Sequence, residues 1–201
     1  MTLANQITIA RILTIPVFVT MAVYYGLGVR LGHPQEWQRV AAILVFTLAA
    51  ASDGLDGYIA RHYNQRTRLG QVLDPLADKG LLITGILTLT FSNWHYGFPL
   101  WFPILVISRD AIVVAGSLLL HFLNGNVPIR PRWTGKTATA LHMAALIAAM
   151  LQHNRPEPLG NPPFTWMDGL VATAGFFTFL SGIGYVVDGI RQLQAGNHAN
   201  A

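Results

Sequence analysis

Repeated apolar runs of about 20 residues constrain this chain more than any other feature of its sequence, because each run is long enough to cross a bilayer as a helix. Hydrophobic residues make up 52% of the chain and charged residues only 11%. A soluble domain carries roughly 25% charged residues. The sequence therefore predicts an all-α, polytopic integral membrane protein: a bundle of six transmembrane helices in which residues 1–201 form a single domain.

The six expected spans are joined by polar loops, one of them rich in Pro and Asn. They cover residues 7–27, 39–60, 69–91, 100–123, 135–152 and 164–190, and residues 192–201 are expected to be frayed. Several aromatic residues near the span ends are typical of an interfacial belt. These are Tyr24, Tyr25, Trp94, Tyr96, Trp101, Phe102 and Trp166.

The distribution of Lys and Arg predicts the orientation of this bundle in an inner (cytoplasmic) membrane. With a cytoplasmic N-terminus, eight basic residues lie inside and three outside, which follows the positive-inside rule. The eight are Arg11, Arg61, Arg66, Arg68, Arg130, Arg132, Lys136 and Arg191, and the three are Arg30, Arg39 and Arg155. Both termini are then expected inside, and the N-terminal residues lack the features of a cleaved signal peptide.

Composition also excludes several kinds of site. Cysteine is absent, so disulfides, a thiol nucleophile and a thiolate metal site are excluded. The seven histidines show no ligand spacing, and no zinc site is expected. The net charge of +4 is interpreted as membrane topology and affinity for anionic head groups, and no nucleic-acid partner is expected.

Four aspartates are the strongest functional candidates, because carboxylates within membrane spans are costly. Asp53 and Asp56 lie toward the end of the second span, and Asp74 and Asp78 lie near the beginning of the third. Spacings of three and four residues place each pair on one helix face. Asp53 and Asp78 lie about eight residues from the cytoplasmic ends of their spans, roughly 12 Å deep. The carboxylates should therefore meet in a cavity open to the cytoplasm.

Hard oxygen ligands in this number predict divalent cations, Mg²⁺ or Mn²⁺. Two cations held by shared carboxylates stabilise the attacking and leaving oxygens of a displacement at phosphorus. Arg61 and Arg68 suit a diphosphate, although membrane anchoring also explains a basic residue there. Small residues accompany the carboxylates and leave room for a phosphate-bearing ligand, with close helix packing as the alternative. They are Gly54, Gly57, Ala60 and Gly70.

The run from Asp53 to Asp78 resembles the motif of the CDP-alcohol phosphatidyltransferase family, D-x2-D-G-x2-A-R-x8-G-x3-D-x3-D. Every gap matches, and the fixed positions are Asp53, Asp56, Gly57, Ala60, Arg61, Gly70, Asp74 and Asp78. A weaker resemblance extends over nearly the whole chain, including residues 5–11 and 136–142.

The resemblance implies a six-helix bundle, usually a homodimer, in which an alcohol attacks the β-phosphate of CDP-diacylglycerol and releases CMP. Asp53, Asp56 and Asp74 would then be the principal ligands of two metals. Asp78 would be the general base on the acceptor hydroxyl and could also touch the second metal. The CDP moiety would be held or accommodated by Asp56, Gly57, Ala60, Arg61 and Gly70.

Arg109 and Lys136, on the fourth and fifth spans, are candidates for binding an anionic acceptor. The alternatives are that Arg109 pairs with Asp110 or Asp78 and that Lys136 anchors a helix start. The branch that uses glycerol 3-phosphate typically carries Arg-Glu and a second Arg near Ser117. Here the pair is Arg109-Asp110, and Ser117 is not basic. The Ser-Arg-Asp form, together with the run from Ser52 to Arg61 and the following Asn64-Gln-Arg, is similar to the CMP-forming cardiolipin synthases. Phosphatidylglycerol is therefore the expected acceptor, and phosphatidylglycerophosphate synthesis from glycerol 3-phosphate is the alternative.

Two other functional classes fit parts of the sequence. A divalent-cation transporter could use the four aspartates, although no polar track continues toward the other side of the membrane. An intramembrane prenyltransferase also holds a metal-bound diphosphate between aspartate-rich helices. Such enzymes have more spans and differently spaced aspartates.

Overall fold

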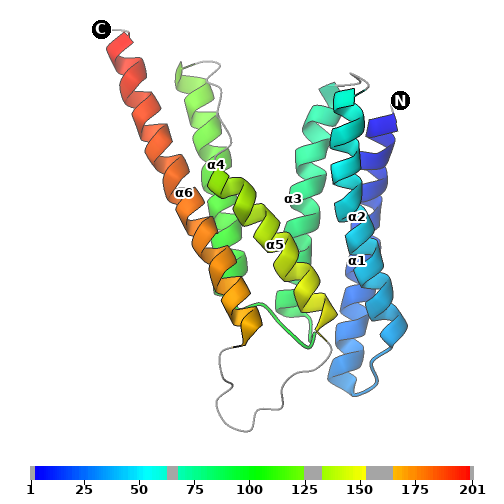
Figure 1. Ribbon diagram of the computed structural model, residues 1–201. Coiled ribbons are helices and arrows are strands. Elements are labelled where there is room, and N and C mark those ends of the chain that lie inside the picture. The colour runs from blue at the N-terminus through cyan, green and yellow to red at the C-terminus, as the bar shows by residue number, and fades with distance from the viewer. Residues whose placement is uncertain (1–2, 63–67, 125–132, 153–164, 200–201) are drawn as a thin grey trace. The chain divides into compact units, whose positions relative to one another are not determined.

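Six α-helices form the secondary structure of the part of the chain that the computed structural model describes (Figure 1). That part comprises the backbone of residues 3–62, 68–124, 133–152 and 165–199, with their side chains except at 3–5, 7, 53–62, 68–76, 119–124 and 192–199. The helices are α1 (Leu3–Leu31), α2 (Glu36–His62), α3 (Arg68–Phe91), α4 (Trp101–Asn124), α5 (Trp133–Leu151) and α6 (Trp166–Ala199). The predicted all-α, six-helix architecture is confirmed.

Three stretches within the described helices are long and apolar enough to cross a membrane, which marks the chain as an integral membrane protein. They are Thr8–Leu31 in α1, Trp101–Leu118 in α4 and Trp166–Arg191 in α6. The second and third helices carry the aspartate pairs, and these charges lower their hydropathy. The two helices that carry the aspartate pairs are therefore the less apolar ones.

Helix ends follow from local sequence. At the end of α1, Gly32 adopts a φ of 79°, and the amides of Gly32 and His33 donate to the carbonyls of Val29 and Gly28 at 3.3 and 2.9 Å. This is the Schellman pattern, which favours glycine at the left-handed position. At the start of α6, the amide of Thr165 donates to Asp168 at 2.9 Å, as in a capping box.

The expected fraying from residue 192 is wrong, because α6 continues to Ala199. The sequence Arg191-Gln-Leu-Gln-Ala continues with good helix formers.

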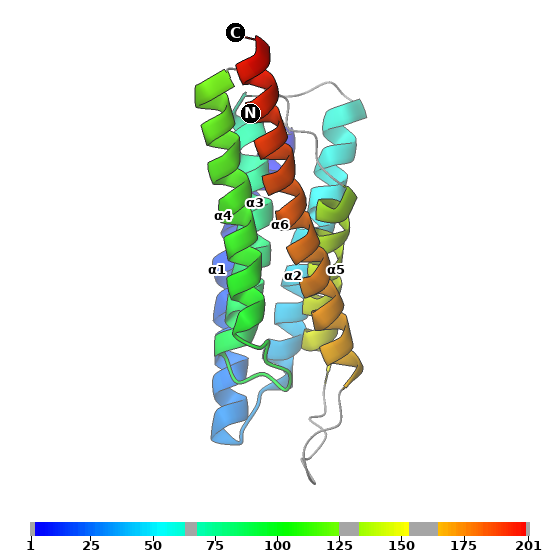
Figure 2. The same ribbon diagram turned by 90° about the vertical axis from the view of Figure 1, so that its left-hand side faces the viewer.

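The described chain divides into two compact units, and each is described by itself. The first comprises Met1–Phe98 and Leu146–Gly160, and the second comprises Pro99–Ala145 and Asn161–Ala201. In the first unit, α1 packs against both α2 and α3, and more extensively than α2 and α3 pack against each other (Figures 1 and 2). In the second unit, α4 packs along α6. The single-domain prediction for residues 1–201 stays a prediction.

The aromatic residues divide between core and surface, so the predicted interfacial belt is wrong for some of its members. Tyr25 and Trp94 are fully buried, with ring centroids 4.7 Å apart in an edge-to-face arrangement. Trp94 Nε1 donates to the carbonyl of Ala22 at 2.9 Å. Phe102 is also buried, whereas Tyr24, Trp101 and Trp166 are exposed. Neighbouring positions such as Tyr24 and Tyr25 project from different faces of a helix, so a position near a span end does not determine burial.

Candidate active site

The two halves of the aspartate motif lie in consecutive helices. Asp53 precedes the end of α2 at His62 by nine residues, and Asp78 follows the start of α3 at Arg68 by ten. At 1.5 Å per residue, both positions lie about 14–15 Å from the connection between the helices. The two positions therefore lie at similar distances from this connection, and the predicted meeting of the carboxylates stays a prediction.

Most side chains of the motif lie outside the described residues. These are Asp53, Asp56, Gly57, Ala60, Arg61, Gly70 and Asp74, for which only the helical backbone is described. Their predicted roles in binding metal and CDP stay predictions. Asp78 is the member whose side chain is described, and its surroundings can be built from the residues upward.

Asp78 pairs with a buried arginine from α1. Arg11 Nη1 lies 3.8 Å from Asp78 Oδ1, and the side chains are 0% and 39% exposed, respectively. This separation is that of an ion pair and exceeds the range of a hydrogen bond. The carboxylate therefore has a cation on its buried side and an accessible side from which a ligand can approach.

The same guanidinium also contacts α2. Arg11 Nε donates to Ser52 Oγ at 3.3 Å, and Ser52 Oγ donates to the carbonyl of Ala49 at 2.8 Å. Ser52 immediately precedes Asp53 in the sequence. Arg11 thus contacts Asp78 in the second half of the motif and Ser52, the residue before its first half, a role that sequence reasoning missed. The available signal was a cation inside an apolar run, where an ionisable residue needs a partner.

The chemistry of the donor set fits a hard divalent cation. Four carboxylates on two consecutive helices supply only oxygen ligands, which Mg²⁺ and Mn²⁺ prefer. The described side chains alone form no group of three or more potential ligands, and Asp53, Asp56 and Asp74 are not among them. The residues fit the predicted metals, but the predicted coordination stays a prediction.

In the second unit, Arg109 of α4 is held in a fixed position. Its Nη1 donates to Asp110 Oδ1 at 2.7 Å, and its Nη2 donates to Ser181 Oγ of α6 at 2.8 Å. The guanidinium carbon lies 5.3 Å from the centroid of the Tyr185 ring. The pairing with Asp110 was one of the alternatives for this residue. The supporting residues Ser181 and Tyr185 were not identified from the sequence.

The beginning of α5 reaches the same guanidinium. A Cβ atom at Gly135 would lie 2.7 Å from Arg109 Nη2 and 3.3 Å from Ser181 Oγ, so glycine allows this close approach without a shift of the guanidinium. Lys136 is the next residue and is exposed in the first turn of α5. The two cations proposed to bind the acceptor therefore come from helices that meet at one point of the second unit.

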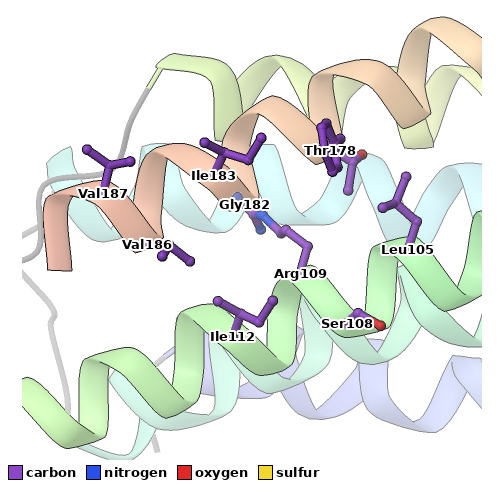
Figure 3. Close-up of a pocket in the computed structure, with 10 residues that line it drawn as sticks. Leu105, Ser108, Arg109, Ile112, Thr178, Gly182, Ile183, Val186 and Val187 are labelled. Atoms are coloured by element: carbon purple, nitrogen blue, oxygen red, sulfur yellow. The ribbon is translucent and has the colours of Figure 1, made fainter. Parts of the chain in front are cut away.

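An elongated apolar pocket of about 330 Å³ lies between α4 and α6 beside Arg109. Figure 3 shows Arg109 reaching from α4 toward Gly182 on α6, with aliphatic side chains extending along both helices. The lining comprises Leu105, Ser108, Arg109, Ile112, Thr178, Phe179, Gly182, Ile183, Val186 and Val187. Arg109 is the charged member of this lining, and its Nε is buried without a hydrogen-bond partner among the described atoms.

Ser117, which weighed in the prediction of the acceptor, uses its hydroxyl within its own helix. Ser117 Oγ donates to the carbonyl of Val113 at 2.6 Å. This is the usual way for a serine to satisfy its hydroxyl inside a helix. Its identity therefore has a local structural explanation and says little about the charge of an acceptor.

Several known proteins are similar to this chain over most of its length. Residues 1–180 match the CDP-alcohol phosphatidyltransferase family. The chain is 32% identical over 207 residues to a CDP-diacylglycerol–glycerol-3-phosphate 3-phosphatidyltransferase of Bacillus subtilis, covering 97% of this chain and 98% of that protein. It is 29% identical over 191 residues to a probable phosphatidylglycerophosphate synthase of Mycobacterium tuberculosis, covering 95% and 83%. A protein of Escherichia coli with the same name as the first relative is 34% identical over 142 residues, covering 70% and 71%.

Proposed function

Because the chain belongs to the CDP-alcohol phosphatidyltransferase family, we propose that it transfers a phosphatidyl group from CDP-diacylglycerol to glycerol 3-phosphate. The products are phosphatidylglycerophosphate and CMP. One observation carries the choice of acceptor: the Bacillus relative, named for glycerol 3-phosphate, matches this chain over almost the full length of both proteins. The relatives from Mycobacterium and Escherichia bear names of the same activity.

This proposal replaces phosphatidylglycerol, the acceptor that the sequence alone favours, with glycerol 3-phosphate. The earlier preference rested on a missing second arginine at Ser117 and on Asp110 in place of Glu. Asp110 still supplies a carboxylate to Arg109 at 2.7 Å, as a glutamate could. Lys136, which is exposed and follows Gly135, provides a second cation near the Arg109 site. Two cations suit the doubly charged phosphate monoester of glycerol 3-phosphate better than the singly charged phosphodiester of phosphatidylglycerol.

The reaction is a displacement at phosphorus. A hydroxyl oxygen of glycerol 3-phosphate forms a bond to the β-phosphorus of CDP-diacylglycerol, and the bond from that phosphorus to the bridging oxygen breaks. CMP leaves with the bridging electron pair. Asp78 accepts the hydroxyl proton on a carboxylate oxygen of its accessible side, and its exposure of 39% supports this role.

The other motif residues would bind the donor. Asp53, Asp56, Asp74 and Asp78 would hold two divalent cations, Mg²⁺ or Mn²⁺, which when bound neutralise phosphate charge. The residues expected to accommodate or hold the CDP moiety are Asp56, Gly57, Ala60, Arg61 and Gly70. Arg109 and Lys136 would bind the phosphate of the acceptor, and the supports of Arg109 by Ser181 and Tyr185 favour a fixed binding geometry.

The proposal includes an orientation and an assembly. The active site faces the cytoplasm and both termini lie inside. This orientation puts eight Lys and Arg residues on the cytoplasmic side and three on the other side, which supports it.

A homodimer is proposed from the family resemblance. Cross-linking of the purified protein in lipid nanodiscs would test it, and a single monomeric species at all protein concentrations would contradict it.

An acceptor panel tests the activity. Purified protein, CDP-diacylglycerol and Mg²⁺ or Mn²⁺ are incubated with glycerol 3-phosphate, phosphatidylglycerol, inositol phosphate or serine, each separately. We expect CMP release that depends on glycerol 3-phosphate. Turnover only with phosphatidylglycerol would restore the cardiolipin synthase alternative.

Two further measurements test the other two functional classes, the transporter and the prenyltransferase. Metal flux into vesicles without lipid turnover would support a transporter. Consumption of a supplied prenyl diphosphate would support a prenyltransferase.

A further inference from the structure

A positive charge inside the apolar run of α1 requires an explanation. Arg11 is 2% exposed and lies within the candidate membrane span Thr8–Leu31. Ionisable residues at such depth are costly, and they persist where they pair with other groups and serve a function. The contacts of Arg11 therefore indicate what it does.

Those contacts lead to both halves of the aspartate motif. One edge of the guanidinium donates to Ser52 of α2 at 3.3 Å, next to Asp53. Another nitrogen lies 3.8 Å from Asp78 of α3. A planar guanidinium can contact two partners in fixed directions, whereas a lysine ammonium is a compact point charge. An arginine at this position can therefore set the position of α2 relative to α3.

The packing of the first unit supports this role. Within the part described, α1 makes most of the contacts that hold α2 and α3, which touch each other less (Figures 1 and 2). The relative placement of Asp53 and Asp78 thus depends on α1. Arg11 is a buried polar residue of α1 that contacts Asp78 and the residue next to Asp53.

We propose that Arg11 is a positioning residue. It holds the Asp78 carboxylate, by its buried side, at a fixed position relative to Ser52 of α2. This inference rests on the proposed function of Asp78 as the base. Asp78 keeps its accessible side for the acceptor hydroxyl, and Arg11 fixes the direction of that side. A misplacement of about 1 Å can cost 10²-fold in rate. Arg11 itself does not contact the reacting atoms.

Arg39 provides a matched control in the same unit. It is also buried, at 9% exposure, and lies on α2 near its beginning. Its Nε and Nη2 donate to the carbonyls of Met150 and Leu151 at 3.1 and 2.7 Å. These are the last carbonyls of α5, so Arg39 caps a helix end. Loss of Arg39 removes comparable burial and hydrogen bonding without touching the motif.

The experiment compares Arg11→Met with Arg39→Met. It measures the thermal unfolding midpoint, equilibrium binding of CDP-diacylglycerol without acceptor, and kcat and KM with glycerol 3-phosphate. For Arg11→Met we expect kcat to fall about 10²-fold, with donor binding within about threefold of the wild type. For Arg39→Met we expect a comparable loss of thermal stability and a kcat within about threefold of the wild type.

If the Met variants do not fold, a second pair of variants with more conservative substitutions still tests the inference. Arg11→Lys retains the charge but lacks the planar fork, so kcat should fall about tenfold, whereas Arg39→Lys should leave kcat unchanged. Equal kcat losses in the Arg11 and Arg39 variants, or a normal kcat in Arg11→Lys, would overturn the inference. If the wild type releases no CMP with any acceptor, the proposed function fails instead, and this outcome is distinct from the variant comparison.

Discussion

Three buried or nearly buried arginines have different partners for their positive charge, and these partners distinguish a structural role from a functional one. Arg39 donates to backbone carbonyls at a helix end, which is a structural role. Arg11 contacts a hydroxyl and a carboxylate on two helices of the aspartate motif. Arg109 is held by Asp110, with further support from α6. The partners of a buried cation thus say more about its function than its burial does.

Asp78 is the residue at which the general-base role can be tested. Asp78→Asn keeps the size of the side chain and removes its ability to accept a proton, so turnover should fall by about 10²–10⁴-fold. Binding of CDP-diacylglycerol should persist, because three of the four proposed metal ligands remain. Steady-state rates and equilibrium binding measure the two effects. A variant that turns over at the wild-type rate would show that another group accepts the proton.

Gly135 tests the proposed acceptor site. In Gly135→Ala the new Cβ would lie 2.7 Å from Arg109 Nη2, so the guanidinium must shift, and we expect its hydrogen bond to Ser181 at 2.8 Å to weaken. Hydrogen bonds to charged groups contribute about 1.5–3 kcal/mol, and KM for glycerol 3-phosphate should rise about tenfold. KM for CDP-diacylglycerol should stay the same.

Gly182→Ala is the control for this change. Its Cβ would make ordinary van der Waals contact with Arg109, at 3.6 Å from Cγ. KM for glycerol 3-phosphate should then match the wild type. Equal effects of the two alanines on this KM would contradict binding of the acceptor by Arg109.

At the scale of elements, hydropathy and spacing predict the helices well, because both are local properties of the sequence. The predicted third span, residues 69–91, agrees with α3 at Arg68–Phe91. The side of a helix that becomes buried depends on its neighbours, and this information is not local. Trp94 therefore appeared to be an interfacial residue, although it packs on Tyr25 in the core of the first unit.

Replacing Trp94 tests this packing. Trp94→Ala removes a fully buried ring and its hydrogen bond to Ala22, and such core truncations cost about 3–5 kcal/mol. Unfolding in detergent, followed by heat or denaturant, measures the change. Trp166→Ala is the control, since Trp166 is 65% exposed and its loss should change stability much less. Similar losses for both variants would place Trp94 outside the core.

At the scale of the whole molecule, the motif spacing was predictable, and the residues that support it were not. Eight motif positions lie within one short stretch, so their pattern can be recognised without the fold. Arg11 and Asp78 meet only through the packing of α1 on α3, and Ser181 supports Arg109 only through the packing of α6 on α4. Contacts between distant segments need the structure. The acceptor favoured by the sequence alone is replaced in our proposal for a related reason, because that prediction rested on single residues whose hydrogen-bond partners were unknown.

The proposed orientation can be tested because the chain contains no cysteine, so single cysteines introduce unique labels. Gln65→Cys lies between α2 and α3, and His33→Cys lies between α1 and α2. In intact cells, an impermeant maleimide should label His33→Cys and leave Gln65→Cys unlabelled until the membrane is opened. The reverse pattern would invert the topology and place the aspartate motif on the outer side.

The transfer of labelled glycerol 3-phosphate into lipid tests the central claim most directly. Purified wild-type protein receives unlabelled CDP-diacylglycerol, a divalent cation and glycerol 3-phosphate that carries a labelled phosphate. The account predicts that the label enters the lipid fraction as phosphatidylglycerophosphate, with one CMP released for each labelled lipid. If the label stays in the aqueous phase while CMP is released only on addition of phosphatidylglycerol, the proposed acceptor is contradicted.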